Sequence, residues 1–190
     1  AGDDAADGAF LETSGGQSGW GYFGVDPVER LTVGAEATLR QREDGSGDGG
    51  ASARAPAGAD SPTLAALQAR LQAESLRRGD CDVPYPCGAI GWCSYDVVRE
   101  LEDLPGEAVD DRDLPRFQAA FFDRLVAWEC PTSEGETTLR ITACPAIGDD
   151  GDQTDADAAF DRGRDRALDL ADRIETGDAD VPTIGDGANA

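Results

Sequence analysis

The chain of 190 residues carries 39 acidic residues against 16 basic ones, a net charge of −23 at pH 7, and every basic residue is Arg because Lys and His are both absent. Such a surface repels phosphate, which argues against nucleic acid and an anionic membrane as partners. The carboxylates are spread along the chain rather than gathered in one block, so we interpret them as a solubilising surface of halophilic type, suited to a salt-rich cytoplasm in which the Debye length falls to about 3 Å at molar salt.

Length and hydropathy limit the architecture further. A chain of this size can bury one sizeable core, so we expect a single domain. No apolar run approaches the roughly 20 residues needed to span a bilayer, and no charged-then-apolar start resembles a signal peptide. We therefore expect a soluble, cytoplasmic protein.

Three strand-like segments near the N-terminus predict a small antiparallel meander. They lie at 20–25, 31–33 and 37–42, with turn-forming residues between them. The next stretch, 43–60, is acidic and rich in Gly and offers almost nothing that could be buried. It predicts a flexible insertion.

A helix is predicted to follow, because Ser61 is a favourable cap and Pro62 suits the first helical position. Gly79 is expected to end this helix. The face expected to pack on the sheet consists of Leu64, Leu67 and Leu71.

The second half of the chain predicts strands and one long helix. Gly88–Tyr95 is expected to form an apolar strand that runs into a short helical segment ending near Glu102. Residues 117–128 and 137–142 are rich in strand formers and predict a hairpin. A helix is predicted over 155–175, with one face formed by Phe160, Ala167, Ala171 and Ile174. The fold class is therefore α+β, with largely antiparallel sheets and flanking helices.

Few residues could carry chemistry. A nucleophile, base and orienter triad normally needs His, which is absent. The cysteines are odd in number and lack the close paired spacing of a zinc ribbon, so we expect free thiols rather than metal ligands. They are Cys81, Cys87, Cys93, Cys130 and Cys144. We expect no metal site and no catalytic residue in this chain.

Three motifs in a fixed order carry a family resemblance. They are Phe10–Thr13 (Phe-Leu-Glu-Thr), Tyr22–Pro27 (Tyr-Phe-Gly-Val-Asp-Pro) and Gly88–Arg99, which runs on to Leu104-Pro105. In this order and at about this separation they resemble the N-terminal region of component I of anthranilate synthase and of aminodeoxychorismate synthase. The resemblance covers residues 10 to about 176, apart from the insertion.

The resemblance implies a domain organisation. Residues 1–176 would form the N-terminal domain of the component I fold, and 177–190 a linker toward a C-terminal chorismate-binding domain outside this sequence. That domain would hold the catalytic machinery and its Mg²⁺, so the 190-residue fragment alone is expected to be inactive. The partners would be that domain and a glutamine amidotransferase, component II, which delivers ammonia.

The resemblance also implies a regulatory pocket. Leu11, Glu12 and Thr13 match part of a family motif that helps bind tryptophan for feedback inhibition, with Thr where Ser is usual. Gly19 and Gly21 stand where a second pocket element carries Arg and Ser. Because a lost hydrogen bond to a charged group costs about 1.5–3 kcal/mol, feedback by tryptophan is expected to be weak.

The longest motif is expected to be structural. Gly88 and Gly91 would permit close backbone approach in a buried strand. Asp96 would cap the helical segment that begins near Tyr95 and contains Arg99. The role expected for this motif is to hold the sheet together rather than to bind a ligand.

Two functions fit these observations. The first is the N-terminal domain of the large subunit of a chorismate-aminating synthase, which scaffolds the catalytic domain and docks the amidotransferase. We prefer aminodeoxychorismate synthase, of the 4-aminobenzoate and folate pathway, to anthranilate synthase of tryptophan biosynthesis, because the feedback pocket is degraded. The second is a stand-alone, non-enzymatic binding protein that kept the fold without the catalytic domain. The downstream reading frame distinguishes the two.

Overall fold

The computed structural model describes residues 8–34, 38–43, 52–54, 60–73, 75–105, 114–131, 136–147 and 153–177. The predicted linker lies outside the described residues apart from Gly177, and so does most of the predicted insertion. No helix in the described ranges is long and apolar enough to cross a membrane.

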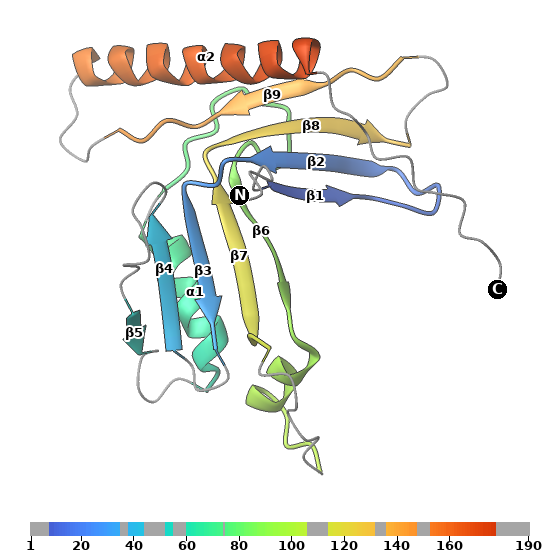
Figure 1. The fold of residues 1–190 in the computed structure, drawn as a ribbon, viewed down its shortest axis with the longest axis vertical. Coiled ribbons are helices and arrows are strands. Elements are labelled where there is room, and N and C mark those ends of the chain that lie inside the picture. Colours follow the sequence, from blue (N-terminus) through green and yellow to red (C-terminus); the bar gives the residue numbers. More distant parts are fainter. Residues whose placement is uncertain are drawn as a thin grey trace, which may run out of the picture.

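The strands form two antiparallel sheets with helices on their outer faces, which confirms the α+β prediction (Figure 1). The first sheet has the order β1 (Gly8–Glu12), β2 (Gly19–Val25), β8 (Arg124–Cys130) and β9 (Arg140–Ala143). The second sheet has the order β5 (Ser52–Arg54), β4 (Thr38–Glu43), β3 (Glu29–Val33), β7 (Phe117–Phe122) and β6 (Gly88–Cys93).

The sheets meet at a corner that the chain crosses twice, and the strands of one sheet run across the direction of the other (Figure 1). Between β2 and β3 the chain bends at Asp26, whose φ of 53° lies in the left-handed region that Asp tolerates better than most residues. Between β7 and β8 it bends at Asp123. Strands that pass from one sheet to the next in this way are typical of near-perpendicular sheet packing.

Two sequence predictions are wrong at this corner. Segments 20–25 and 31–33 are not neighbours in a meander, because β2 pairs with β1 and β8 whereas β3 pairs with β4 and β7. Residues 117–128 form two strands in different sheets rather than one long strand. Both halves are apolar and buried, so the pattern does not reveal the bend at Asp123. The predicted hairpin is confirmed for β8 and β9.

A third prediction is wrong inside the insertion. β5 lies within 43–60 and pairs with β4, with Thr38 opposite Arg54. Backbone pairing of this kind leaves little trace in composition, which is why the segment resembled a flexible loop.

The core has three parts, each between two layers. Tyr22, Ala120, Phe122, Leu125 and Ala127 fill the angle between the two sheets together with Val83. Leu31, Val33, Phe117, Ala119 and Phe121 pack against Ala66 of α1 (Pro62–Gln72), and Val25 and Val126 pack against Leu170 of α2 (Gln153–Thr176). Each sheet therefore carries its own helix and shares one inner core.

The start of α1 is as predicted. The hydroxyl of Ser61 accepts a hydrogen bond from the Leu64 N–H at 3.2 Å, and Pro62 occupies the first helical position. The helix ends at Gln72, well before Gly79, so the predicted end is wrong. Gly79 has a φ of 56° and serves a turn further along the chain.

The buried face of α1 differs from the predicted leucine stripe. Leu64 and Leu71 are exposed, and the buried residues are Thr63 and Ala66, with Leu67 packed partly against the core. The small side chains of Thr63 and Ala66 suit an element that lies close to its neighbours. Thr63 can face inward because its polar atoms have partners, as described below.

α2 also turns a different face to the core. It lies along β9 on the outside of the first sheet (Figure 1). The buried residues are Ala159, Gly163 and Leu170, whereas Phe160 and Ile174 of the predicted face are exposed. A Cβ at Gly163 would lie 3.0 Å from the Pro145 ring, so the absence of a side chain allows this close approach.

Ion pairs join α2 to the corner. The Asp26 carboxylate accepts hydrogen bonds from Arg124 and Arg173, each at 2.7 Å, and Arg166 pairs with Asp123. The hydrogen bond from Arg173 is the largest cause of a lowered pKa of Asp26. Arg124 is almost fully buried, and its Nη1 also donates to the Arg166 carbonyl at 3.3 Å. This network sets the position of α2 over the first sheet.

Candidate functional site

An open pocket of about 290 Å³ lies beside the first sheet, where the ends of β1 and β2 meet the segment before β6. Its lining is Leu11, Glu12, Thr13, Trp20, Tyr22, Pro84 and Tyr85. The three residues predicted as a pocket remnant are therefore together in one pocket. The register of β1 on β2 places Leu11 opposite Tyr22, and both the N–H and the hydroxyl of Thr13 donate to the Trp20 carbonyl.

The wall opposite the sheet is a loop that the motifs did not indicate. Val83 is 1% exposed and anchors this loop in the inner core. The guanidinium of Arg78 donates to the carbonyl oxygens of Cys81 and Val83, at 3.1 and 2.6 Å. Tyr85 then packs edge-on against Tyr22, with ring centroids 5.9 Å apart. The run Pro84-Tyr85-Pro86, one aromatic residue between two prolines, is the sequence signal that could have indicated a pocket wall.

Aromatic rings give the pocket its chemical character. Burial raises the pKa of the Tyr22 hydroxyl, so Tyr22 is a neutral phenol at neutral pH. The Trp20 ring stacks near Tyr22, and the guanidinium of Arg140 lies 5.2 Å from the Trp20 centroid. Arg140 is itself paired with Glu129 at 3.0 Å. The pocket can hold a flat apolar or aromatic group. Its lining residues include no nucleophile paired with a base.

The carboxylate of Glu12 points away from these rings. Glu12 Oε1 accepts a hydrogen bond from Trp128 Nε1 at 3.2 Å and from the Cys130 thiol at 3.8 Å. Trp128 lies two residues from Val126 along β8 and so shares the sheet face that packs on α2. The Tyr22 ring lies on the inner face. Glu12 thus lines the pocket edge while its charge is used on the other side of the sheet.

Gly19 and Gly21 lie beside these contacts, and their lack of side chains has a structural reason. A Cβ at Gly21 would overlap the indole ring of Trp128, and a Cβ at Gly19 would overlap the side chain of Thr13. Side chains such as Arg or Ser at these two positions are therefore incompatible with the observed places of Trp128 and Thr13.

The Gly88–Arg99 motif lies elsewhere, at the edge of the second sheet. β6 is not the buried strand that was predicted. Most of its residues are exposed, including Trp92, and among the described strands of its sheet β6 is the last and pairs with β7. Gly91 does allow close approach, since a Cβ there would overlap the carbonyl oxygen of Gln118. A Cβ at Gly88 would meet no neighbouring atom, so close approach is not the reason for this glycine. Its φ of 136° is a backbone conformation that residues with a side chain rarely adopt.

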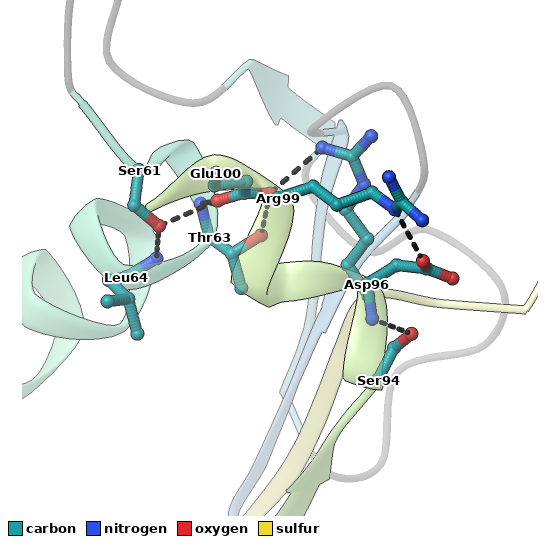
Figure 2. A network of polar contacts seen from close by, with 8 residues as sticks. Ser61, Thr63, Leu64, Ser94, Asp96, Arg99 and Glu100 are labelled. Atoms are coloured by element: carbon teal, nitrogen blue, oxygen red, sulfur yellow. Dashed lines mark hydrogen bonds and ion pairs between the residues drawn. The ribbon is translucent and has the colours of Figure 1, made fainter. Parts of the chain in front are cut away.

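The helical end of the motif is capped by a residue that was not predicted. η1 (Tyr95–Glu100) begins after Ser94, whose hydroxyl accepts from the Asp96 N–H at 3.2 Å (Figure 2). Asp96 is thus in the first turn rather than at the cap, and its carboxylate pairs with Arg99 at 3.1 Å. Tyr95 is 87% exposed. The predicted motif residues therefore do not converge on the pocket.

Glu100 is the best-connected polar residue of this region, and sequence reasoning missed it. Its carboxylate accepts from the Ser61 hydroxyl at 2.6 Å, from the Thr63 N–H and hydroxyl at 3.0 and 2.7 Å, and from Arg116 at 2.9 Å (Figure 2). Burial would raise the pKa of Glu100, but these hydrogen bonds outweigh it and lower the pKa. Glu100 connects η1 to the N-terminus of α1. This structural role could not be predicted from the sequence, where Glu100 is a single acidic residue after the motif.

The cysteines do not form a site. All five are free thiols, and a hydrogen bond with Cys87, together with burial, raises the pKa of Cys144. No group of three acidic or Cys side chains in the described ranges is arranged to hold a metal ion. The described residues therefore offer no site for the Mg²⁺ that the resemblance implies.

Comparison with known proteins identifies the relatives. No protein-family model matches the chain. Anthranilate synthase component 1 3 of Haloarcula marismortui is 50% identical over 169 residues, which is 89% of this chain and 29% of that protein. The chain is a relative of anthranilate synthase component 1. Anthranilate synthase component 1 1 of the same organism is 47% identical over 178 residues, 94% of this chain and 31% of that protein.

A third relative of the same name is more distant. Anthranilate synthase component 1 of Mycolicibacterium smegmatis is 36% identical over 100 residues, 52% of this chain and 17% of that protein. The chain spans about 30% of the length of the two Haloarcula proteins. The resemblance drawn from three motifs is thus confirmed, and it concerns one part of component 1.

The fold agrees with this relationship. The crystal structure of anthranilate synthase component I from Streptococcus pneumoniae TIGR4 matches 88% of this chain with a TM-score of 0.52, at 12% identity, and the match covers 31% of that chain. At this identity the likeness concerns the fold alone. The two-sheet arrangement is therefore shared with part of a solved component I structure.

Proposed function

We propose that this chain is the N-terminal part of the large subunit of a chorismate-aminating synthase, and that it supports a catalytic domain rather than performing the chemistry. The 50% identity to a Haloarcula anthranilate synthase component 1 over 89% of the chain carries this proposal. The polar clusters add support, because Glu100 joins η1 to the start of α1 and the Asp26 network joins α2 to the first sheet, which are structural roles.

Anthranilate is the product that the names of the three relatives favour. Aminodeoxychorismate is the second candidate, and Gly19 and Gly21 favour it. They stand where the resemblance places the Arg and Ser of a second pocket element, so these polar partners for an amino-acid inhibitor are missing, and a folate-pathway enzyme has no need of inhibition by tryptophan.

The pocket is assigned to regulation within this proposal. Its aromatic lining of Trp20, Tyr22 and Tyr85 suits a flat ligand, and Glu12 already has an internal partner. The catalytic centre, its Mg²⁺ and the docking of a glutamine amidotransferase, component II, belong to the whole subunit. The acidic surface, with a net charge of −23, fits work at high salt.

The test uses the full-length protein that carries this sequence, at molar KCl with Mg²⁺ and chorismate. With ammonium as nitrogen donor, mass spectrometry should detect anthranilate. With glutamine, product should form only when the amidotransferase is added. Aminodeoxychorismate as the product would select the second candidate. Unchanged chorismate with both donors would refute the proposal and favour a stand-alone binding protein.

A further inference from the structure

Two cysteines lie close to the bend at Asp123, one beside each sheet. Cys87 directly precedes β6, whose first residue pairs with Phe122 at the end of β7. Cys144 directly follows β9, whose last residue pairs with Arg124 at the start of β8. The N–H of Cys144 donates to the Asp123 carbonyl at 2.7 Å. The corner thus brings together two segments that are far apart in the chain and belong to different sheets.

The described cysteines and carboxylates do not gather into a metal site, but two of the thiols are in contact. The hydroxyl of Thr142 in β9 donates to the Pro86 carbonyl at 2.6 Å and so holds the segment before β6 against β9. The Cys144 thiol shares a hydrogen bond with Cys87, the residue after Pro86. Pro145 lies against α2, which fixes the chain on the other side of Cys144. Thiols in hydrogen-bond contact need only a short side-chain movement to form an S–S bond of about 2.0 Å.

The two thiols differ in how readily they ionise. The hydrogen bond with Cys87, followed by burial, raises the pKa of Cys144, and the neighbouring Cys81 and Asp123 act in the same direction. Cys144 therefore keeps its proton and donates it to a Cys87 thiolate, the form of a thiol that attacks a disulfide. Cys87 is only partly buried, so a small reagent can reach it. Once Cys87 has reacted, its charge is gone, and with it the main reason for the raised pKa of Cys144.

We propose that Cys87 and Cys144 are a redox-active pair that forms a disulfide by exchange with a low-molecular-weight disulfide, RSSR. The Cys87 thiolate attacks one sulfur of RSSR, forms a mixed disulfide and releases RS⁻. Cys144 then loses its proton, and its thiolate attacks the Cys87 sulfur and releases the second RS⁻. The two thiol protons pass to the released groups, so two protein thiols and RSSR give one protein disulfide and two RSH. This chemistry does not involve chorismate and is independent of the proposed function.

The disulfide would also act on the wall of the open pocket. It would connect the start of β6 in the second sheet to the end of β9 in the first. Tyr85, which lines the pocket, lies two residues before Cys87. Because a cross-link between distant residues removes conformations of the opened chain, the bond would hold this wall against β9.

The first experiment maps the bond. The full-length protein at molar KCl is treated with bis(2-hydroxyethyl) disulfide, a small neutral RSSR, then alkylated with iodoacetamide and digested with trypsin. Within this chain trypsin cleaves only after Arg, so Cys144 lies in peptide 141–162, whereas Cys81, Cys87 and Cys93 share peptide 79–99. Mass spectrometry should show these two peptides linked, and dithiothreitol should separate them.

Matched variants assign the partner of Cys144 within peptide 79–99. Cys87→Ser should lower the amount of linked peptides at least tenfold, whereas Cys81→Ser and Cys93→Ser should leave it unchanged. A wild-type protein without the link, or a link that survives in Cys87→Ser, would overturn the proposal.

A further variant tests the order of the two steps. Cys144→Ser removes the second nucleophile, so one half of the reagent should remain attached to Cys87, whereas in wild type Cys144 displaces it. The exposed Cys93 should carry the reagent in both proteins, which confirms that the reagent is active. An unmodified Cys87 in the Cys144→Ser variant, or a lasting adduct on Cys87 in wild type, would contradict the mechanism.

Hydrogen exchange tests the effect on the pocket wall. After oxidation of the full-length protein, amide exchange of residues 81–87 should slow by about threefold or more, because the cross-link suppresses local opening of this segment. The same treatment of Cys87→Ser should change nothing there. An unchanged exchange rate in oxidised wild type would show that the bond does not hold the wall, and that part of the proposal would be wrong.

Discussion

Glu100→Ala is expected to destabilise the protein by about 3 kcal/mol. The Glu100 side chain is 6% exposed and accepts hydrogen bonds from Ser61, from two groups of Thr63 and from Arg116. Removing one partner of a buried ion pair costs about 3–5 kcal/mol, because the other partners are left buried without compensation. Arg116 is 35% exposed and regains water, which places the loss at the lower end of that range.

Two further variants separate charge from position. Glu100→Gln keeps the shape and one acceptor oxygen but loses the charge, so its expected loss is about 1.5–2 kcal/mol. Glu102→Ala removes an exposed carboxylate two residues away and should change the free energy of unfolding by less than about 0.5 kcal/mol.

The contribution of Glu100 should depend on pH with a definite sign. Its pKa in the folded protein is lowered from the ordinary value of 4.5, because hydrogen bonds to the ionised form outweigh the effect of burial. The stabilisation is therefore fully present above pH 4.5 and is lost as the pH falls through the folded-state pKa. The difference between wild type and Glu100→Gln should shrink below pH 4.5.

Urea unfolding followed by circular dichroism, at constant molar KCl, measures these differences. Urea is preferred to a guanidinium salt because it leaves the ionic strength unchanged. A loss below about 1 kcal/mol for Glu100→Ala, or a loss equal to that of Glu102→Ala, would refute the reasoning. So would a difference between wild type and Glu100→Gln that stays constant from pH 7 to pH 4.

Other features of the molecule give four more expected outcomes. In the same assay Gly91→Ala should lower the free energy of unfolding by about 3 kcal/mol or more, because its Cβ would overlap the Gln118 carbonyl. The control Gly16→Ala meets no neighbour and should lower it by about 1–2 kcal/mol, because Gly16 has a φ of 72°. Equal losses for the two variants would contradict the pairing of β6 with β7. The 190-residue chain alone should convert no chorismate, and anthranilate or aminodeoxychorismate made by the purified chain would show that it does hold catalytic residues. Circular dichroism of the chain across a KCl series should show structure gained toward molar salt, since a net charge of −23 repels itself in dilute buffer, and full structure without salt would mean that this repulsion is overestimated. Tryptophan titrated calorimetrically into the full-length protein should bind weakly or not at all, because Glu12 is engaged by Trp128; a micromolar Kd abolished by Glu12→Ala would contradict this.

Features set by neighbouring residues could be predicted from the sequence. The start of α1 follows from Ser61 and Pro62, and the hairpin of β8 and β9 follows from two strand-forming runs close in the chain. The three-motif resemblance could also be recognised, because each motif is a short run of residues whose types are informative by themselves. In all these cases the deciding interactions lie within a few residues or across one turn.

Only the tertiary structure decided which elements meet. An apolar run shows that a segment is buried but not against what, so the bend at Asp123 and the inward faces of α1 and α2 were not predictable. Glu100 binds the start of α1 from 37 residues away, and Trp128 donates to Glu12 from 116 residues away. Such partners are selected by the packing of whole sheets and helices, because burying these polar groups is favourable only where every neighbouring element is already in place.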